Sequence, residues 1–427
     1  MVGLRAARVG AVMTVLAFLA LWTSGCGRGD DADVQADSGP LGALVVDADG
    51  DKPAVLVVID DGDDISAPID AGSSESELSD SEMTEDELAE PEPALDTSAA
   101  VAPTTTTAPP RSSGVPLVIF ETDMGPDIDD ALGLAMLHGY AKLGLIEIAA
   151  VTISRNSEAS ARYTDALNTF YGRPDIPIAI NRHASPYFDD RQNYVRLADS
   201  LSYDVTSEQI EDGYILQRRV MADALSNGRD LLLIQTGFSG NVSRLLNSSG
   251  DSISPKSGIE LARDAVSEFS IMAGALDMSL IEFNIEKDVA PARNVFAKWP
   301  GALALSPFEL GYHIHYPYSA IKSELAWMDN HPIRRSYEWN DLDWHQDAPP
   351  FYNMRSWDLT SIIHAIEPES DYFLTSGRGT VSVNGEGRTS FALGSGQHYV
   401  LDRGRQYSQQ QRQRVVDRMV ELVSMRP

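Results

Sequence analysis

The chain has 427 residues but only one cysteine, so no intramolecular disulfide can stabilise it and its fold depends on a hydrophobic core or on a bound metal. That residue, Cys26, lies outside any plausible domain, which argues against thiol chemistry at a catalytic site. Basic residues are also scarce. There are 33 lysines and arginines against 63 aspartates and glutamates, a formal net charge of −30. Such a chain repels polyanions, and we expect no nucleic-acid partner.

The N-terminus holds an apolar run with the features of an export signal. Arg5 and Arg8 precede the apolar stretch 9–22, which is short for a membrane span and ends in small residues before Cys26. Residues 1–26 resemble a bacterial lipoprotein signal. The resemblance implies that Cys26 is lipidated and that the exported protein is anchored to the membrane, at the cell surface or in the periplasm. An ordinary cleaved signal peptide is the alternative.

Residues 27–112 contain no aromatic side chain, and their 22 acidic residues outnumber three basic ones. A segment of this composition cannot bury enough apolar surface to offset its chain entropy, so it is predicted to be a disordered acidic linker. Its proline- and threonine-rich end is typical of an extended spacer. Two short apolar runs, Ala43–Val46 and Ala54–Ile59, are the places in it where strand pairing is expected.

Residues 113–427 have the pattern of one catalytic domain. Leu117–Phe120 is a short apolar run typical of a buried parallel strand. Further strands are predicted at Ile146–Ile153, Ile176–Ile180 and Leu231–Ile234, and helices at Ala131–Lys142, Ser157–Tyr171, Gln209–Ser226 and from about Asn241. This alternation predicts an α/β fold with a mainly parallel, Rossmann-like central sheet flanked by helices. A β-hairpin at Phe373–Phe391 and a helix at Ser408–Ser424 are expected to close the chain.

A dense group of carboxylates directly follows the first predicted strand. Ten residues contain Glu121, Asp123, Asp127, Asp129 and Asp130. Like charges held this close raise one another's pKa and destabilise a fold, whereas a hard cation such as Ca²⁺ takes six to eight oxygen ligands. In a parallel α/β sheet, chemistry is placed at the carboxyl ends of the strands. The sequence therefore predicts a metal site here, an exposed acidic loop without a role being the alternative.

The acidic run resembles the N-terminal aspartate motif of inosine-uridine-type nucleoside hydrolases, calcium-dependent enzymes that cleave the N-glycosidic bond of ribonucleosides. The match is to the variant with two extra residues between its acidic pairs. The resemblance implies that Asp123 ligates Ca²⁺ and takes a proton from water, that Asp129 binds ribose hydroxyls, and that Asp130 is a second calcium ligand. Asp127 falls in the insertion and has no assigned role.

Three later segments follow in the order of that family. The loop Gln235–Asn241 resembles the one whose backbone carbonyl ligates the ion, with Gly240 at the matching position. Glu282 and Asn284, in a Glu-Phe-Asn run, resemble the pair that holds the sugar hydroxyls. Asp358, in a Trp-Asp run, would complete the calcium shell and touch the ribose.

The chain also departs from the family. Trp357 stands where many members have a histidine that assists the leaving base, so this help must come from elsewhere, for instance His345, or from stacking of the base on Trp357. Asn156, after a predicted strand, is a candidate contact to the base or the ribose. Asp288 is expected to cap a helix. Base preference stays open, and a homo-oligomer is possible.

The function implied is hydrolysis of ribonucleosides to ribose and free base, by a Ca²⁺-bound water that Asp123 activates. Two alternatives are left open. One is a haloacid-dehalogenase-like phosphatase that uses Mg²⁺ and would need Glu121 as its nucleophile. The other is a non-catalytic surface lipoprotein that binds a nucleoside or sugar at the same residues.

Overall fold

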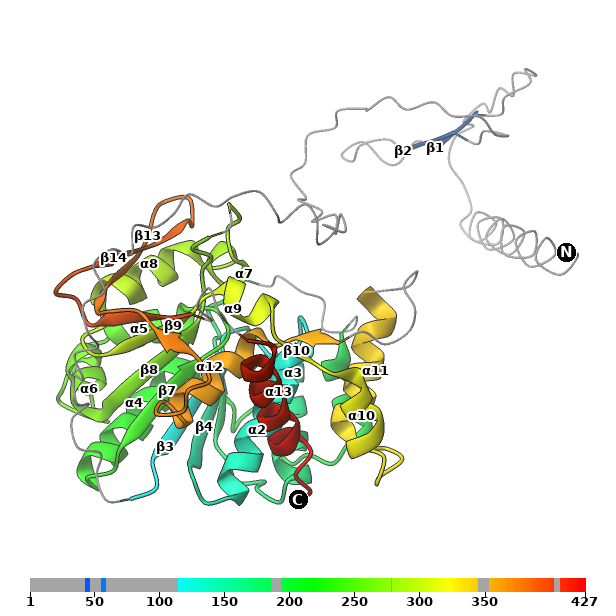
Figure 1. The fold of residues 1–427 in the computed structure, drawn as a ribbon, viewed down its shortest axis with the longest axis horizontal. Coiled ribbons are helices and arrows are strands. Elements are labelled where there is room, and N and C mark those ends of the chain that lie inside the picture. Colours follow the sequence, from blue (N-terminus) through cyan, green and yellow to red (C-terminus); the bar gives the residue numbers. More distant parts are fainter. Residues whose placement is uncertain are drawn as a thin grey trace, which may run out of the picture. The chain divides into compact units, whose positions relative to one another are not determined.

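The computed structural model describes residues 43–46, 55–58, 114–185, 193–277, 279–344, 353–402 and 408–427 (Figure 1). The signal segment with Cys26, most of the predicted linker, and His345 lie outside the described residues. Contacts divide the chain into two units, Met1–Asp96 and Thr97–Pro427. In the first unit, β1 (Ala43–Val46) pairs antiparallel with β2 (Val55–Val58), so the two apolar runs do meet.

The second unit is built on one large sheet with the strand order β14-β13-β15-β9-β8-β7-β3-β4-β5-β6. Its parallel strands are β3 (Leu117–Thr122), β4 (Glu147–Ile153), β5 (Ile178–Ile180), β6 (Glu211–Asp212), β7 (Leu231–Gln235), β8 (Val266–Met272), β9 (Leu303–Ser306) and β15 (His398–Asp402). The predicted hairpin is β13 (Gly379–Val383) with β14 (Thr389–Leu393), and the short β12 (Leu374–Thr375) pairs with β15. A mainly parallel sheet is therefore confirmed.

Helices cover both faces of this sheet (Figure 1). One face carries α2 (Asp129–Lys142), α3 (Glu158–Phe170), the 3₁₀ helix η2 (Tyr194–Ser200), α12 (Trp357–Ile366) and α13 (Gln409–Val423). The other carries α4 (Gly213–Ser226), α5 (Gly240–Asn247), α6 (Gly258–Ala265) and α8 (Val289–Lys298). The remaining elements are α7 (Phe283–Glu286), α9 (Phe308–Tyr312), α10 (Tyr318–Glu324), α11 (Pro332–Trp344) and the pair β10 (His315–Tyr316) and β11 (Met354–Arg355).

The central strand β3 shows why its sequence is apolar throughout. Val118 and Phe120 pack into the core beneath α2 and α12, while Leu117 and Ile119 pack into the core beneath α4 and α5. Successive strand residues point to opposite faces, so a strand covered on both sides needs apolar residues at every position. Its carboxyl end, between β4 and β7, is where the acidic run begins.

Four of the parallel strands, β6, β8, β9 and β15, were not predicted from the sequence, and β6 occupies the start of the segment predicted as the helix Gln209–Ser226. In β8, Ser267, Glu268 and Ser270 interrupt the apolar pattern, although the strand lies between β7 and β9. The buried Ser270 hydroxyl donates to the carbonyl of Ser361, 2.9 Å away, which satisfies its polar group. Tertiary packing thus overrides local composition here. Among the helices of the described residues, none has both the length and the apolar character that a membrane crossing requires.

Candidate active site

The acidic run forms a buried loop between β3 and the first turn of α2. Asp123 is 6% exposed, and Asp129 and Asp130 are each 1% exposed. Carboxylate oxygens of Asp127, Asp129 and Asp130 all lie within 4.8 Å of one another. Asp127, which has no role by resemblance, therefore belongs to the tightest part of the group.

A fifth carboxylate reaches this loop from the other end of the domain. Asp358 lies in the first turn of α12 and is 5% exposed. Its backbone nitrogen donates to a carboxylate oxygen of Asp129 at 3.3 Å, and the charges of Asp130, Asp127 and Asp123 raise the pKa of its carboxyl group. Since α2 and α12 pack on the same face of the sheet, their first turns bring together residues more than 200 positions apart in the sequence. The charges of Asp123 and Asp130 raise the pKa of Asp358, so the three predicted ligands lie near one another, although only Asp130 of them belongs to the group within 4.8 Å. Their role as metal ligands stays a prediction.

The electrostatics of this aspartate cluster, which we define as Asp123, Asp127, Asp129, Asp130 and Asp358, favour a bound cation. Burial is the largest cause that raises the pKa of each carboxyl, and the charges of the neighbouring aspartates add to it for four of them. The pKa of Asp130 is raised to about 7. Carboxylates held this close repel one another unless protons or a cation neutralise their charge. A hard cation with oxygen ligands can replace such protons, and the donor set fits one.

Arg155 is a buried cation beside this cluster. Its Nη1 donates to the carbonyl oxygen of Met124 at 3.0 Å and to the Ser160 hydroxyl at 3.2 Å. Its charge lowers the pKa of Asp123 and Asp130. The next residue, Asn156, which was the predicted substrate contact, is exposed and donates to the carbonyl of Arg182. The structure therefore brings Arg155, and not Asn156, to the cluster. The position of Arg155 just past the end of β4 is the sequence feature from which its place at the site could have been predicted.

The loop after β7 also contacts the cluster. The contact is made by Thr236 and not by Gly240, the residue predicted from the sequence. The side chain of Thr236 is hydrogen-bonded to the carboxyl of Asp358 and lowers its pKa. A Cβ atom on Gly237 would lie 2.4 Å from the backbone nitrogen of Asp123, so only glycine allows this close approach. Gly240, in contrast, begins α5 and its backbone N–H donates to Asp288. The contacts favour Thr236 over Gly240 as the residue of this loop nearest the cluster.

The Glu-Phe-Asn segment is anchored mainly to backbone. The carboxylate of Glu282 accepts hydrogen bonds from the backbone N–H groups of Gly274, Asn284 and Ile285, and burial raises its pKa to about 7. Asn284 donates to the carbonyl oxygen of Thr236 at 2.8 Å. This bond connects the segment to the residue that contacts Asp358. The predicted contacts of Glu282 and Asn284 to ribose stay predictions.

Two other residues singled out in the sequence, Trp357 and Asp288, make contacts within the protein. Trp357 is half-buried, donates from Nε1 to the carbonyl of Phe308, and lies with its ring centroid 5.2 Å from that of Phe308. The guanidinium of Arg355 lies 5.6 Å from the Trp357 ring. The capping role expected for Asp288 is wrong: it precedes α8 but makes no side-chain cap hydrogen bond, because its carboxylate accepts the N–H of Gly240 instead.

Glu121 points away from the aspartate cluster, because it lies on the opposite face of β3. Its carboxyl accepts hydrogen bonds from Thr152, from Gln217 at 2.7 Å and from Asn241 at 2.9 Å. Complete burial raises its pKa to about 8, against the effect of these three donors. Glu121 is therefore mainly a neutral carboxylic acid at pH 7.

Replacing Glu121 with glutamine is expected to increase stability at alkaline pH. The folded-state pKa lies above the unfolded value, so the wild type loses about 1.4 kcal/mol of stability per pH unit between the unfolded pKa and pH 8, and no more beyond. Glutamine has no proton to lose. The difference in unfolding free energy between Glu121→Gln and wild type, measured by denaturant titration from pH 5 to 9, should rise and level off near pH 8. A pH-independent difference would contradict the assignment.

No protein-family model matches this sequence, and no curated protein is similar to it. Several solved structures are similar to the fold. A purine-preferring ribonucleoside hydrolase from Gardnerella vaginalis aligns with a TM-score of 0.56 and 16% identity over 72% of this chain and 98% of that chain. A plant nucleoside hydrolase, PpNRh1, aligns with a TM-score of 0.54 and 16% identity over 73% of this chain and 99% of that chain.

A third similar structure is the type III effector protein XopQ, complexed with adenosine diphosphate ribose. It aligns with a TM-score of 0.50 and 13% identity over 74% of this chain and 95% of that chain. At these identities the likeness establishes the fold. The second unit of the chain has the α/β fold found in nucleoside hydrolases.

Proposed function

We propose that this chain, which has the fold of nucleoside hydrolases, cleaves the N-glycosidic bond of ribonucleosides to ribose and free base, with Ca²⁺ bound at the aspartate cluster. The observation that carries the proposal is the meeting of Asp358 with Asp123 and Asp130 at the carboxyl end of β3. Asp123, Asp130 and Asp358 would hold the ion, with a backbone carbonyl from the loop that contains Thr236 as a further ligand. When bound, Ca²⁺ lowers the pKa of a coordinated water and orients sugar hydroxyls.

The residues of the cluster then have separate parts in the reaction. Asp123 accepts the proton of the attacking water as a general base. The neighbouring carboxylates stabilise the positive charge that develops at C1′ of the ribose as the base departs. Asp129, Glu282 and Asn284 accept hydrogen bonds from the ribose hydroxyls through their side-chain oxygens. A deoxy sugar would leave such buried groups unpaired, so the site should discriminate against it.

The leaving base has a distinct set of neighbours in this proposal. Trp357 begins the same helix as Asp358, and its ring lies among Phe308, Tyr312 and Arg355. An aromatic surface beside the sugar site suits stacking of a planar base. Departure of the base is then assisted by stacking rather than by a histidine at this position.

A haloacid-dehalogenase-like phosphatase is disfavoured by the position of Glu121. That mechanism needs an accessible carboxylate as nucleophile, whereas Glu121 is fully buried against α4 and α5 and held by three donors. A binding protein that keeps the nucleoside site without turnover is the second candidate. It is favoured by Trp357, which stands where many nucleoside hydrolases have the histidine that assists the leaving base.

Ribose release from a panel of purine and pyrimidine ribonucleosides, with Ca²⁺ and with a chelator, tests the proposal. We expect release with at least one ribonucleoside in Ca²⁺ and a loss of it in the chelator, with the matching deoxyribonucleoside a much poorer substrate. Saturable binding of nucleosides without release would favour the binding protein. Release that is the same in the chelator would contradict a metal-dependent mechanism.

The proposed location of this activity rests on the composition of the N-terminal segment. We propose that Cys26 carries the lipid anchor and that residues 27–112 act as an acidic spacer between the membrane and the hydrolase. Their 22 acidic residues would repel an anionic membrane surface and keep the catalytic unit away from it. Homo-oligomer formation stays a prediction.

A further inference from the structure

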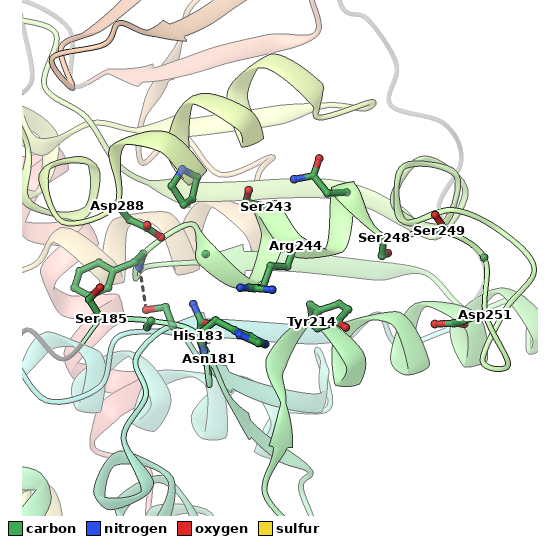
Figure 2. Close-up of a pocket in the computed structure, with 17 residues that line it drawn as sticks. Asn181, His183, Ser185, Tyr214, Ser243, Arg244, Ser248, Ser249, Asp251 and Asp288 are labelled. Atoms are coloured by element: carbon green, nitrogen blue, oxygen red, sulfur yellow. Dashed lines mark hydrogen bonds between the residues drawn. The ribbon is translucent and has the colours of Figure 1, made fainter.

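A second potential site lies beside α4 and α5, the helices that cover the face of the sheet opposite to α2 and α12. A cavity of about 730 Å³ is lined by residues of α4, α5 and the start of α8 and by the loops after β4 and β5 (Figure 2). None of the five aspartates of the cluster is among the described residues that line it. Its volume is in the range of cavities that hold small organic ligands.

One end of the cavity presents buried hydrogen-bonding groups. Asn181 is 3% exposed; its side-chain oxygen accepts the backbone N–H of His183, while its Nδ2 makes no hydrogen bond with a described residue. Figure 2 shows Asn181 and Asp288 directed toward each other at this end. A Cβ atom on Gly240 would lie 2.3 Å from Asn181 Nδ2 and 3.1 Å from a carboxylate oxygen of Asp288. Glycine thus keeps free the space that both polar groups border.

Further along the cavity the charge is positive. Arg244, on α5, forms no ion pair with a described residue, and it lines the cavity together with His183. The imidazole Nε2 of His183 is 2.9 Å from the carboxylate of Asp212, which holds the ring in place. The nearby carboxylate of Asp251 does not cancel the charge of Arg244, because both its oxygens are bonded to Arg218.

We propose that this cavity binds a phosphorylated sugar. Asp288 can accept hydrogen bonds from sugar hydroxyls while Asn181 Nδ2 donates to one, and the hydroxyls of the lining serines add further partners. The phosphate would lie against Arg244, whose planar guanidinium suits bidentate contact with phosphate oxygens, and against His183. This inference does not depend on the proposed hydrolase activity, because no side chain of the aspartate cluster lines the cavity, although the loop after β7 borders both.

The test is isothermal titration calorimetry on the full chain in a chelator, which keeps the aspartate cluster free of metal. The probes are ribose 5-phosphate, ribose and inorganic phosphate. We expect saturable binding of ribose 5-phosphate, at least about 10-fold tighter than either part alone, since both ends of the cavity then contribute. Arg244→Gln should weaken it by about 10-fold or more. Arg263→Gln, on the exposed surface of α6, is the matched control and should leave it unchanged.

A second variant separates the two ends of the cavity. Asp288→Asn should weaken ribose 5-phosphate binding but leave inorganic phosphate unaffected. The proposal is overturned if ribose 5-phosphate shows no saturable binding, if ribose or phosphate alone binds as tightly, or if Arg244→Gln binds like the wild type. Nucleoside hydrolysis is measured separately in Ca²⁺, so its failure and the failure of this inference are distinguishable.

Discussion

Replacing Asp123 with alanine is expected to lower the rate of ribose release by about 10²- to 10⁴-fold, the usual contribution of a general base, and by more if the metal is lost as well. Asp123 follows the central strand directly and lies beside Asp130 and Asp358. The rate is measured on the best ribonucleoside of the panel, in Ca²⁺, for the variant and the wild type.

Asp199→Ala is the control, because Asp199 is an exposed aspartate at the end of η2, away from the cluster. It should retain wild-type turnover. Circular dichroism and the melting temperature of Asp123→Ala in the chelator show whether the fold is retained. Removing one of five crowded carboxylates should not destabilise the metal-free protein. Turnover close to the wild type in a folded Asp123→Ala variant would remove Asp123 from the role of base.

The second large effect is expected from the metal itself: Ca²⁺ should raise the melting temperature of the chain above its value in a chelator. A ligand at 100 times its dissociation constant stabilises the folded state by about 2.7 kcal/mol. For a domain of this size each kcal/mol shifts the melting temperature by roughly 2–4 °C. The aspartate cluster has one buried cation beside it, Arg155, among the described residues, so much of its charge is left for a metal to neutralise.

The stabilisation by Ca²⁺ should depend on pH in a defined direction. The pKa values of the clustered carboxyls are raised in the folded state, that of Asp130 to about 7, so the folded state binds protons more tightly than the unfolded one. Without metal, stability should therefore be greatest at low pH and fall as pH rises from about 4 toward 7. Ca²⁺ should oppose this fall, and its stabilising effect should be larger at pH 7.5 than at pH 5. Differential scanning fluorimetry at both pH values, with Ca²⁺, Mg²⁺ or chelator, measures it.

The double variant Asp130→Asn, Asp358→Asn is the matched test for the site. It removes two charges and keeps the shape of both side chains. Its melting temperature in the chelator at pH 7.5 should equal or exceed that of the wild type, while its response to Ca²⁺ should be small. An unchanged Ca²⁺ response in this variant would place the metal elsewhere, and no response in the wild type would contradict a calcium site.

Local sequence patterns determined much of this protein. The apolar run of β3, the acidic residues behind it, the alternation of strands and helices, the hairpin and the capped helix α13 can all be predicted, because each depends on neighbours a few residues away. The Asn-Gly turn is an example: the Asn384 side chain accepts the backbone N–H groups of Glu386 and Arg388, which are local contacts. The resemblance to nucleoside hydrolases also rests on short runs of this kind.

Only the tertiary structure decided which of these segments meet. The meeting of Asp358 with Asp130 depends on how α2 and α12 pack on the sheet. Whether Arg155 or Asn156 reaches the cluster depends on a shift of one residue after the end of β4. The burial of Glu121 depends on which face of β3 it occupies. Distances across a sheet are set by packing over hundreds of residues, and no local periodicity encodes them. The sequence alone therefore determined which residue types form the site, and the fold determined which of them are neighbours.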